Sequence, residues 1–388
     1  MSQSSKREYL KKMRERYGRR TGRRARGLLI DEVCEVCGYE RKYAIKVLSG
    51  VRNGALGRRR GGPRRFYQPG TDTGVLKRIW LTAEQPCGKR LKAMLALWLP
   101  HYEGQYGALG KEQRNRLLKI SAATIDRLLA GSRARWGKHG RCSTRPGTLL
   151  RSQIPVRTEH WDVSGPGYLE ADTVAHCGMS MAGDFAYSLT LTDIFSQWTE
   201  TRAIWNRGQY EVLSRIREVE AALPFPILGF DSDNGGEFLN WHLYDYFCKR
   251  PKVVEFTRSR AYKKNDNAHV EQKNWTHVRQ LVGYDRLAYP PQAQLLNDLY
   301  ANEWGHFRNF FCPVMKHLRT EIHGSRKRRV YDAPRTPFQR LRDSATLSAG
   351  KLKELEQLQN RLNPFALKKV IEAKLRRVLH YRPAASAA

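Results

Sequence analysis

The hydrophobic pattern of this chain changes character between its first third and its middle. From about position 168 apolar residues alternate with polar ones, and from about position 210 stretches of helical spacing alternate with short apolar runs. The pattern predicts strands at 168–176, 185–195, 198–205, 226–230 and 253–257, and helices at 210–223, 241–248 and 266–282. Three strands followed by alternating helices and strands favour an α/β architecture: a mixed five-stranded sheet flanked by helices.

Before residue 150 the spacing is helical. Apolar positions predict helices at 28–37 and 40–48, separated by a tight turn at Gly38-Tyr39. This pattern is typical of a helix-turn-helix module, and it makes Arg41, Lys42 and Lys46 available to DNA. A second helical pair is expected at 111–119 and 122–129. We therefore interpret this part of the chain as all-α helix-turn-helix modules.

The distribution of charge supports the division between the N-terminal and middle parts of the chain. Lys and Arg number 70 against 37 Asp and Glu, a formal net charge of +33. Residues 1–165 carry +24, residues 166–290 carry −2 and residues 291–388 carry +11. Such an excess is not needed by an enzyme of small neutral substrates, and it favours a nucleic-acid partner. The expected segments are a helix-turn-helix region (1–56), a basic linker (57–70), a second helical DNA-binding region (71–150), a catalytic core (151–290) and a small basic C-terminal region (291–388).

The cysteine content and the hydropathy of the chain indicate the cellular compartment in which the protein works. The seven cysteines are an odd number, which favours a reducing compartment, and neither a signal peptide nor a bilayer-spanning run is recognisable. We expect a cytoplasmic protein with no membrane partner. Cys34-x-x-Cys37 lacks a nearby second pair of ligands, so two buried helix cysteines are a better interpretation than zinc.

Three carboxylates lie where the predicted elements would bring them to one edge. Asp172 lies within the first strand, Asp233 follows the fourth strand in DSDNGGEF, and Glu271 lies early on the long helix in KNDNAHVEQKNW. A glycine-rich turn after a strand lets a substrate backbone approach closely. Carboxylates from separate elements can hold two divalent cations roughly 4 Å apart, as in-line phosphoryl transfer requires.

These strings, in this order, resemble the retroviral-integrase-type (RNase H-like) catalytic core, and most closely that of bacterial insertion-sequence DDE transposases. The likeness extends over about 167–282, and Glu271 follows Asp233 by 38 positions. It implies that Asp172, Asp233 and Glu271 form the metal-binding triad, with two Mg²⁺ or Mn²⁺ ions per active site. It also implies a DNA transposase that cleaves element ends and joins the 3′-OH to target DNA, working as a homodimer or larger oligomer on double-stranded DNA. The His-His-Cys-Cys zinc module of retroviral integrases has no match here.

Other acids compete for these roles. Asp231 and Glu170 each precede a triad member by two positions, and we interpret them as supporting or substrate-facing groups, while Glu237 and Asp193 remain rivals. Trp275 is expected in the core, and Lys273 is expected to point away from the ligands. The remaining basic and amide residues expected to bind DNA lie in the linker and before the catalytic helix: Arg58, Arg59, Arg60, Arg64, Arg65, Arg258, Arg260, Lys263, Lys264 and Asn267.

In the C-terminal arm, the basic run at 326–329 introduces the Pro-punctuated stretch VYDAPRTPFQRL, which is typical of an extended connection. A leucine stripe at 352–362 and a basic helix at 365–379 follow. Two rival functions stay open at this stage. A structure-specific nuclease would cut DNA without joining it, and a non-catalytic DNA-binding protein would bind without cutting.

Overall fold

The computed structural model describes residues 3–49, 66–68, 70–136, 163–233, 235–258, 268–323 and 326–383. Contacts group the chain into two compact units, Met1–Phe66 and Tyr67–Ala388. The expected five-segment division stays a prediction. No helix within the described residues combines the length and the apolar character needed to cross a bilayer.

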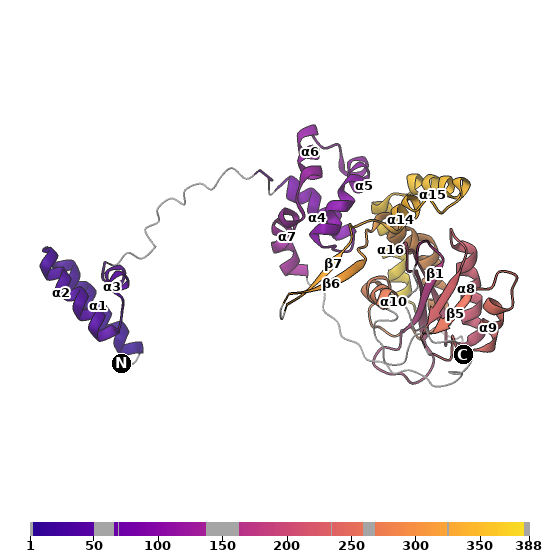
Figure 1. The fold of residues 1–388 in the computed structure, drawn as a ribbon, viewed down its shortest axis with the longest axis horizontal. Helices are drawn as coiled ribbons and strands as arrows, with labels where there is room; N and C mark the ends of the chain where they lie inside the picture. The colour runs from indigo at the N-terminus through magenta and orange to yellow at the C-terminus, as the bar shows by residue number, and fades with distance from the viewer. Residues whose placement is uncertain are drawn as a thin grey trace. The chain divides into compact units, whose positions relative to one another are not determined.

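The N-terminal unit contains three helices (Figure 1): α1 (Gln3–Arg19), α2 (Arg23–Cys37) and α3 (Arg41–Leu48). Gly38 ends α2 in the left-handed conformation, at φ 66°, so the chain turns sharply into α3. A small core joins the helices through Met13, Val33, Ala44 and their neighbours. Of the two cysteines expected to be buried in this helix, Cys37 lies in that core, whereas Cys34 is only half-buried.

The second unit is built on a mixed five-stranded sheet of order β3-β2-β1-β4-β5. β1 pairs antiparallel with β2, β2 pairs antiparallel with β3, and β4 is parallel to both β1 and β5. This confirms the expected fold class for the middle of the chain. The strands are β1 (Tyr168–Ala175), β2 (Ala186–Asp193), β3 (Thr199–Trp205), β4 (Gly229–Ser232) and β5 (Glu255–Arg258).

Helices cover both faces of this sheet. Figure 1 shows α8 and α9 on one side and α10 and α16 on the other. Nearly every residue of the inner strand β2 and of the edge strand β3 is buried, as expected where helices cover both faces of a sheet. The helices after β3 are α8 (Gln209–Ala222), α9 (Trp241–Cys248), α10 (Ala268–Lys273), η1 (Asn274–Arg279), α11 (Gln280–Val282), α12 (Pro290–Asp298), η2 (Leu299–Trp304) and α13 (Gly305–Phe311).

The second helical region packs on this core. Trp98 lies fully buried among the rings of Phe307, Phe311 and Phe365, and its Nε1 donates to the carbonyl of Phe311 at 3.0 Å. An aromatic cluster of this kind contributes several kcal/mol through apolar burial, on the order of 2–3 per large side chain. The helices of this region are α4 (Asp72–Thr82), α5 (Gly88–Tyr106), α6 (Lys111–Lys119) and α7 (Ala122–Trp136).

The C-terminal region differs in part from the extended connection expected over VYDAPRTPFQRL, since this stretch begins inside a strand and a helix starts at Pro337. The basic run forms β7 (Arg326–Tyr331), which pairs antiparallel with β6 (His317–His323) in a two-stranded hairpin. Cross-strand main-chain bonds hold this pair together, and its side chains are mostly exposed, so hydropathy gives no sign of it. The chain ends in three helices: α14 (Pro337–Asp343), α15 (Ala349–Arg361) and α16 (Pro364–Leu379).

Candidate active site

The pairing of β1 with β4 brings two of the three expected carboxylates together. The strands are parallel and in register, with Glu170 opposite Asp231 and Ala171 opposite Ser232. Asp172 and Asp233 are the next residue of each strand path, and neighbouring strands lie about 4.8 Å apart. Two aspartates far apart in the sequence therefore meet at the end of the parallel ladder.

Electrostatics confirm this proximity. Burial, followed by the charge of Asp233, raises the pKa of Asp172 to about 8, and Glu271 and Glu237 contribute in the same direction. Burial and the charge of Glu237 raise the pKa of Asp233 to about 6, against the lowering effects of Arg207 and a backbone hydrogen bond. Four acids thus affect one another across one small region, and a cation among them would remove that repulsion.

Two neighbours orient Asp172. Its Oδ1 accepts from the backbone N–H of Thr173 at 2.7 Å, and its Oδ2 accepts from Asn274 Nδ2, also at 2.7 Å. Asn274 Oδ1 is buried and has no hydrogen-bond partner among the described residues. Because Asn274 lies one turn after Glu271, the helix that carries the third acid also fixes the first one.

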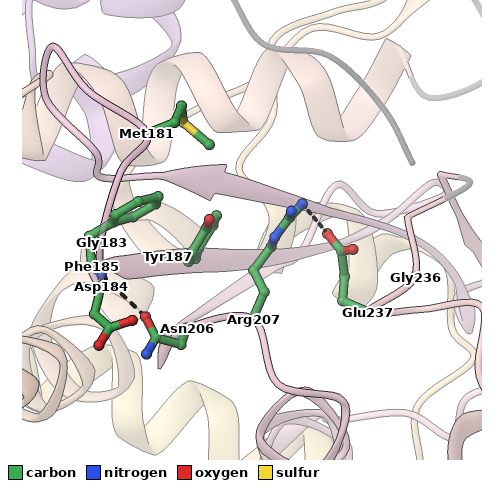
Figure 2. Close-up of a pocket in the computed structure, with 9 residues that line it drawn as sticks. All are labelled: Met181, Gly183, Asp184, Phe185, Tyr187, Asn206, Arg207, Gly236 and Glu237. Atoms are coloured by element: carbon green, nitrogen blue, oxygen red, sulfur yellow. Dashed lines mark hydrogen bonds and ion pairs between the residues drawn. The ribbon is translucent and has the colours of Figure 1, made fainter.

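The turn after β4 is built around Gly235. Its N–H donates to Asp233 Oδ1 at 2.9 Å. A Cβ at this position would lie 2.5 Å from Glu237 Oε2 and 2.9 Å from Asp233 Oδ1, so the glycine lets both carboxylates lie close to the turn. Glu237 is buried and accepts from Thr173 Oγ1 at 3.1 Å and from Arg207 Nη1 at 3.0 Å (Figure 2).

Glu271 is exposed on α10, and its charge contributes to the raised pKa of Asp172. The start of that helix is tied to the sheet, since Glu170 Oε2 accepts from the N–H of Val270 at 3.1 Å. A carboxylate at a helix N-terminus is also favoured by the helix dipole. Among the described residues, no three His, Cys, Asp or Glu side chains lie close enough to hold one metal ion. The carboxylate oxygens of the cluster are donors of the kind that Mg²⁺ prefers.

The rival acids have structural partners. Glu170 anchors α10, and Asp231 is buried and accepts from Thr257 Oγ1 at 2.6 Å. Asp193 accepts from the backbone N–H groups of Gly167 and Ser196 at 2.8 and 2.6 Å, closing the turn between β2 and β3. These hydrogen bonds account for the positions of all three carboxylates, so no bound ligand is needed to explain them.

Two expectations on the catalytic helix have different outcomes. Lys273 does point away from Glu271: it is fully buried and its Nζ donates to the carbonyl of Gln197 at 3.3 Å. Burial lowers the pKa of this lysine well below its usual value. The core position expected for Trp275 is wrong, because its side chain is 40% exposed. The helix continues as a π-helical turn from Asn274, which rotates the following side chains away from ideal α spacing.

The expected DNA-binding residues fall into three groups. Arg41, Lys42 and Lys46 are exposed on α3 of the N-terminal unit, and Arg41 forms an ion pair with Asp31. Arg258, expected in a loop, is the last residue of β5 and half-buried, because the strand extends one position beyond the apolar run. The others lie outside the described residues: Arg58, Arg59, Arg60, Arg64, Arg65, Arg260, Lys263, Lys264 and Asn267.

Sequence reasoning missed two residues of the site. Asn274 carried a signal, since it lies three positions after Glu271 and therefore shares its helix face. Arg207 carried none, because it lies in the turn after β3 and reaches Glu237 only through the folded sheet. The turn brings it there in an uncommon conformation, with positive φ at Asn206 (55°) and Arg207 (29°).

Fold and site together define the class: a mixed α/β sheet flanked by helices that gathers acidic side chains at the end of its parallel strands. No protein-family model matches the chain. It is 36% identical over 345 residues to the uncharacterized protein y4rM of Sinorhizobium fredii (strain NBRC 101917 / NGR234), covering 88% of this chain and 96% of that protein. The chain belongs to the same family as y4rM.

Solved structures similar to this one include two viral proteins. The HTLV-2 integrase catalytic core domain, in complex with magnesium, overlaps 38% of this chain and 90% of its own, with 15% identity and a TM-score of 0.28. A simian T-cell lymphotropic virus intasome, in complex with the PP2A regulatory subunit B56 gamma, overlaps 62% of this chain and 73% of its own, with 14% identity and a TM-score of 0.30. Both overlays are partial, and the fold described here rests on strand order and direction.

Proposed function

We propose that the protein is a DDE-type DNA transposase, in which Asp172, Asp233 and Glu271 hold two Mg²⁺ ions. The observation that carries this proposal is the acidic cluster itself, in which burial, followed by the charges of neighbouring acids, raises the pKa of Asp172 to about 8. Such an arrangement is costly unless cations use it. Two bound ions would supply Lewis-acid chemistry for cutting a phosphodiester and for transferring the freed 3′-OH to target DNA.

The chain's own residues would prepare this chemistry. Asn274 and the N–H of Thr173 hold Asp172 in one orientation, and the N–H of Gly235 does the same for Asp233. Glu170 holds the start of α10, so Glu271 is carried on an anchored helix. Gly236, beside the carboxylates, has open space around the position of a Cβ, which leaves room for a DNA backbone to approach. The net charge of +33 supplies attraction to DNA and makes binding dependent on salt.

The test uses the full chain and a plasmid carrying the DNA that flanks its own gene, with Mg²⁺ or Mn²⁺. Wild type is compared with Glu271→Gln, and with Glu356→Gln as a matched control, since Glu356 is an exposed acid on α15. We expect cleaved and joined products from wild type and the control, and loss of both in Glu271→Gln.

Two other results would contradict the proposal. Cleavage without joining would make the protein a nuclease, and tight binding without either reaction would make it a DNA-binding protein. Native gel mobility of the DNA complex tests the expected homodimer or larger oligomer in the same samples.

A further inference from the structure

The β6–β7 hairpin exposes both of its faces. Leu318, Ile322 and Tyr331 are 58%, 66% and 41% exposed, and Arg328 and Arg329 are exposed as well. In the described part of the chain, its sheet consists of these two strands alone. Because an isolated two-stranded hairpin is at best marginally stable in water, its exposed apolar side chains indicate a surface that a binding partner completes.

The base of the hairpin is nevertheless held firmly. Asp332 Oδ1 accepts from the N–H of Lys316 at 2.7 Å, and the N–H of Asp332 donates to the carbonyl of Lys316 at 3.0 Å. Arg340 of α14 donates to Asp332 Oδ2 at 2.6 Å and to the carbonyl of Val314 at 3.1 Å. Lys316 Nζ donates to the carbonyl of Phe195, after β2, at 3.1 Å. The hairpin is therefore a ribbon with a fixed base and exposed strands.

The charge of the ribbon indicates the chemistry of its partner. Residues 316–331 contain six Lys and Arg against a single acid, Glu321. Basic side chains along both strands would repel those of a second copy of the ribbon, and charged strands of this kind disfavour pairing between edges. A polyanion is attracted by the same charges, so duplex DNA fits this surface better than another protein chain does.

The two faces of the ribbon differ in charge. Residues directly opposite one another share a face, so Glu321 lies with Arg328 and, two positions along its own strand, with Arg319. Glu321 forms ion pairs with these arginines, at 2.7 Å to Arg319 and 3.9 Å to Arg328. The other face carries Thr320, opposite Arg329, and Ile322. The single acid of the ribbon thus lies on one face, and the face of Arg329 is free of acids.

We propose that the β6–β7 hairpin inserts into the major groove of duplex DNA with the face of Thr320, Ile322 and Arg329 toward the base edges. The major groove is about 12 Å wide and admits a two-stranded ribbon, whose strands lie about 4.8 Å apart. Arginine binds guanine O6 and N7 with two hydrogen bonds, and an apolar side chain contacts the methyl group of thymine. The proposal rests on the proposed function, since it takes DNA as the partner.

The test measures DNA binding by the full chain in EDTA, so that no cleavage occurs. Two duplexes of the DNA that flanks its own gene are compared, one with guanine and one with 7-deazaguanine, which lacks the N7 acceptor of the major groove. We expect Arg329→Ala to bind the guanine duplex about tenfold more weakly than wild type does. Its affinity for the 7-deazaguanine duplex should fall by about twofold, because that contact is already impaired.

Arg319→Ala is the matched control. It removes the same charge from the same hairpin, but Arg319 lies on the opposite face and is paired with Glu321. We expect this variant to lose affinity by less than about threefold, and by the same factor on both duplexes, because a lost charge acts without regard to the base.

Three results would overturn the proposal. Arg329→Ala could bind both duplexes as wild type does, or lose the same factor on both. Alternatively, Ile322→Asp could abolish self-association of the DNA-free chain with DNA affinity unchanged, which would assign this face to a second copy. Addition of Mg²⁺ to the binding samples tests the proposed function separately. Cleavage without the guanine-specific loss would leave the transposase and remove the ribbon contact, and the reverse result would support the ribbon and contradict the catalytic proposal.

Discussion

Replacing Asp172 with Asn should change how the stability of the metal-free protein depends on pH. In the fold the pKa of Asp172 is raised to about 8, first by burial and then by Asp233, whereas an unfolded aspartate titrates near its ordinary value of 3.8. Between these values the folded protein holds a proton that the unfolded chain has released. Stability contributed by this group therefore falls as pH rises from about 4 to about 8.

The magnitude follows from linkage. One proton difference is worth about 1.4 kcal/mol per pH unit. Because Asp172 is half-buried, with some access to solvent, we expect about 1 kcal/mol per unit. Asp172→Asn removes this slope, so the variant should be about 2 kcal/mol more stable than wild type at pH 7 if the two are matched at pH 5.

The assay is urea unfolding of both proteins in EDTA at several pH values from 5 to 8. Repetition with Mg²⁺ serves as the second arm, since a bound cation replaces the proton and should stabilise wild type more than the variant. Parallel stability curves for the two proteins in EDTA would refute the reasoning, because they would show that Asp172 titrates alike in the folded and unfolded states.

Three other substitutions test separate parts of the account. Asn274→Ala removes the amide that orients Asp172, and we expect cleavage to slow by about 10–100-fold with DNA affinity unchanged in a gel-shift titration. Gly88→Ala puts a Cβ 2.4 Å from a carbonyl oxygen, whereas the same change at Gly104 of the same helix meets nothing within 4 Å. Thermal unfolding should therefore show a loss of about 1–3 kcal/mol at Gly88 and a small gain at Gly104, and equal effects would contradict the packing. Burial lowers the pKa of His176 to about 3, so its share of stability is complete above about pH 6.5 and is lost as pH falls toward 3; His176→Gln should reduce the decline between pH 6.5 and 5 by about 2 kcal/mol in urea titrations.

The sequence was sufficient for the elements that have a regular apolar pattern. The helices between 209 and 248 follow helical spacing, and apolar runs mark strands whose two faces are covered. The fourth strand nevertheless lies at Gly229–Ser232, a few positions after the predicted 226–230. The β6–β7 hairpin could not be predicted in this way. Its strands are rich in charged residues, and the cross-strand bonds that stabilise it leave no trace in hydropathy. The same limit applies to α4 and α5, whose core partners lie some two hundred residues away, as the bond from Trp98 to Phe311 illustrates.

The candidate site was predictable to the extent that it depends on local motifs. Asp172 and Asp233 are brought together by the register of β1 and β4, and an acid at a strand end is visible in the sequence. The hydrogen bonds that occupy Glu170 and Asp193 were not visible in the sequence, since their donors, Val270 and Gly167, lie far from them along the chain. The contact between Arg207 and Glu237 could not be predicted, because only the turn after β3 in the folded protein brings the two side chains together.

The most direct measurement of the central claim is joining of a pre-cut DNA end to a second duplex with Mg²⁺. A pre-cut end already carries its 3′-OH, so the assay isolates strand transfer from hydrolysis. The account predicts joined product from wild type and less than about one-thousandth as much from Asp233→Asn, with DNA binding by the variant retained. Equal joining by the two proteins, or no joining by wild type on an end that it binds and cuts, would contradict it.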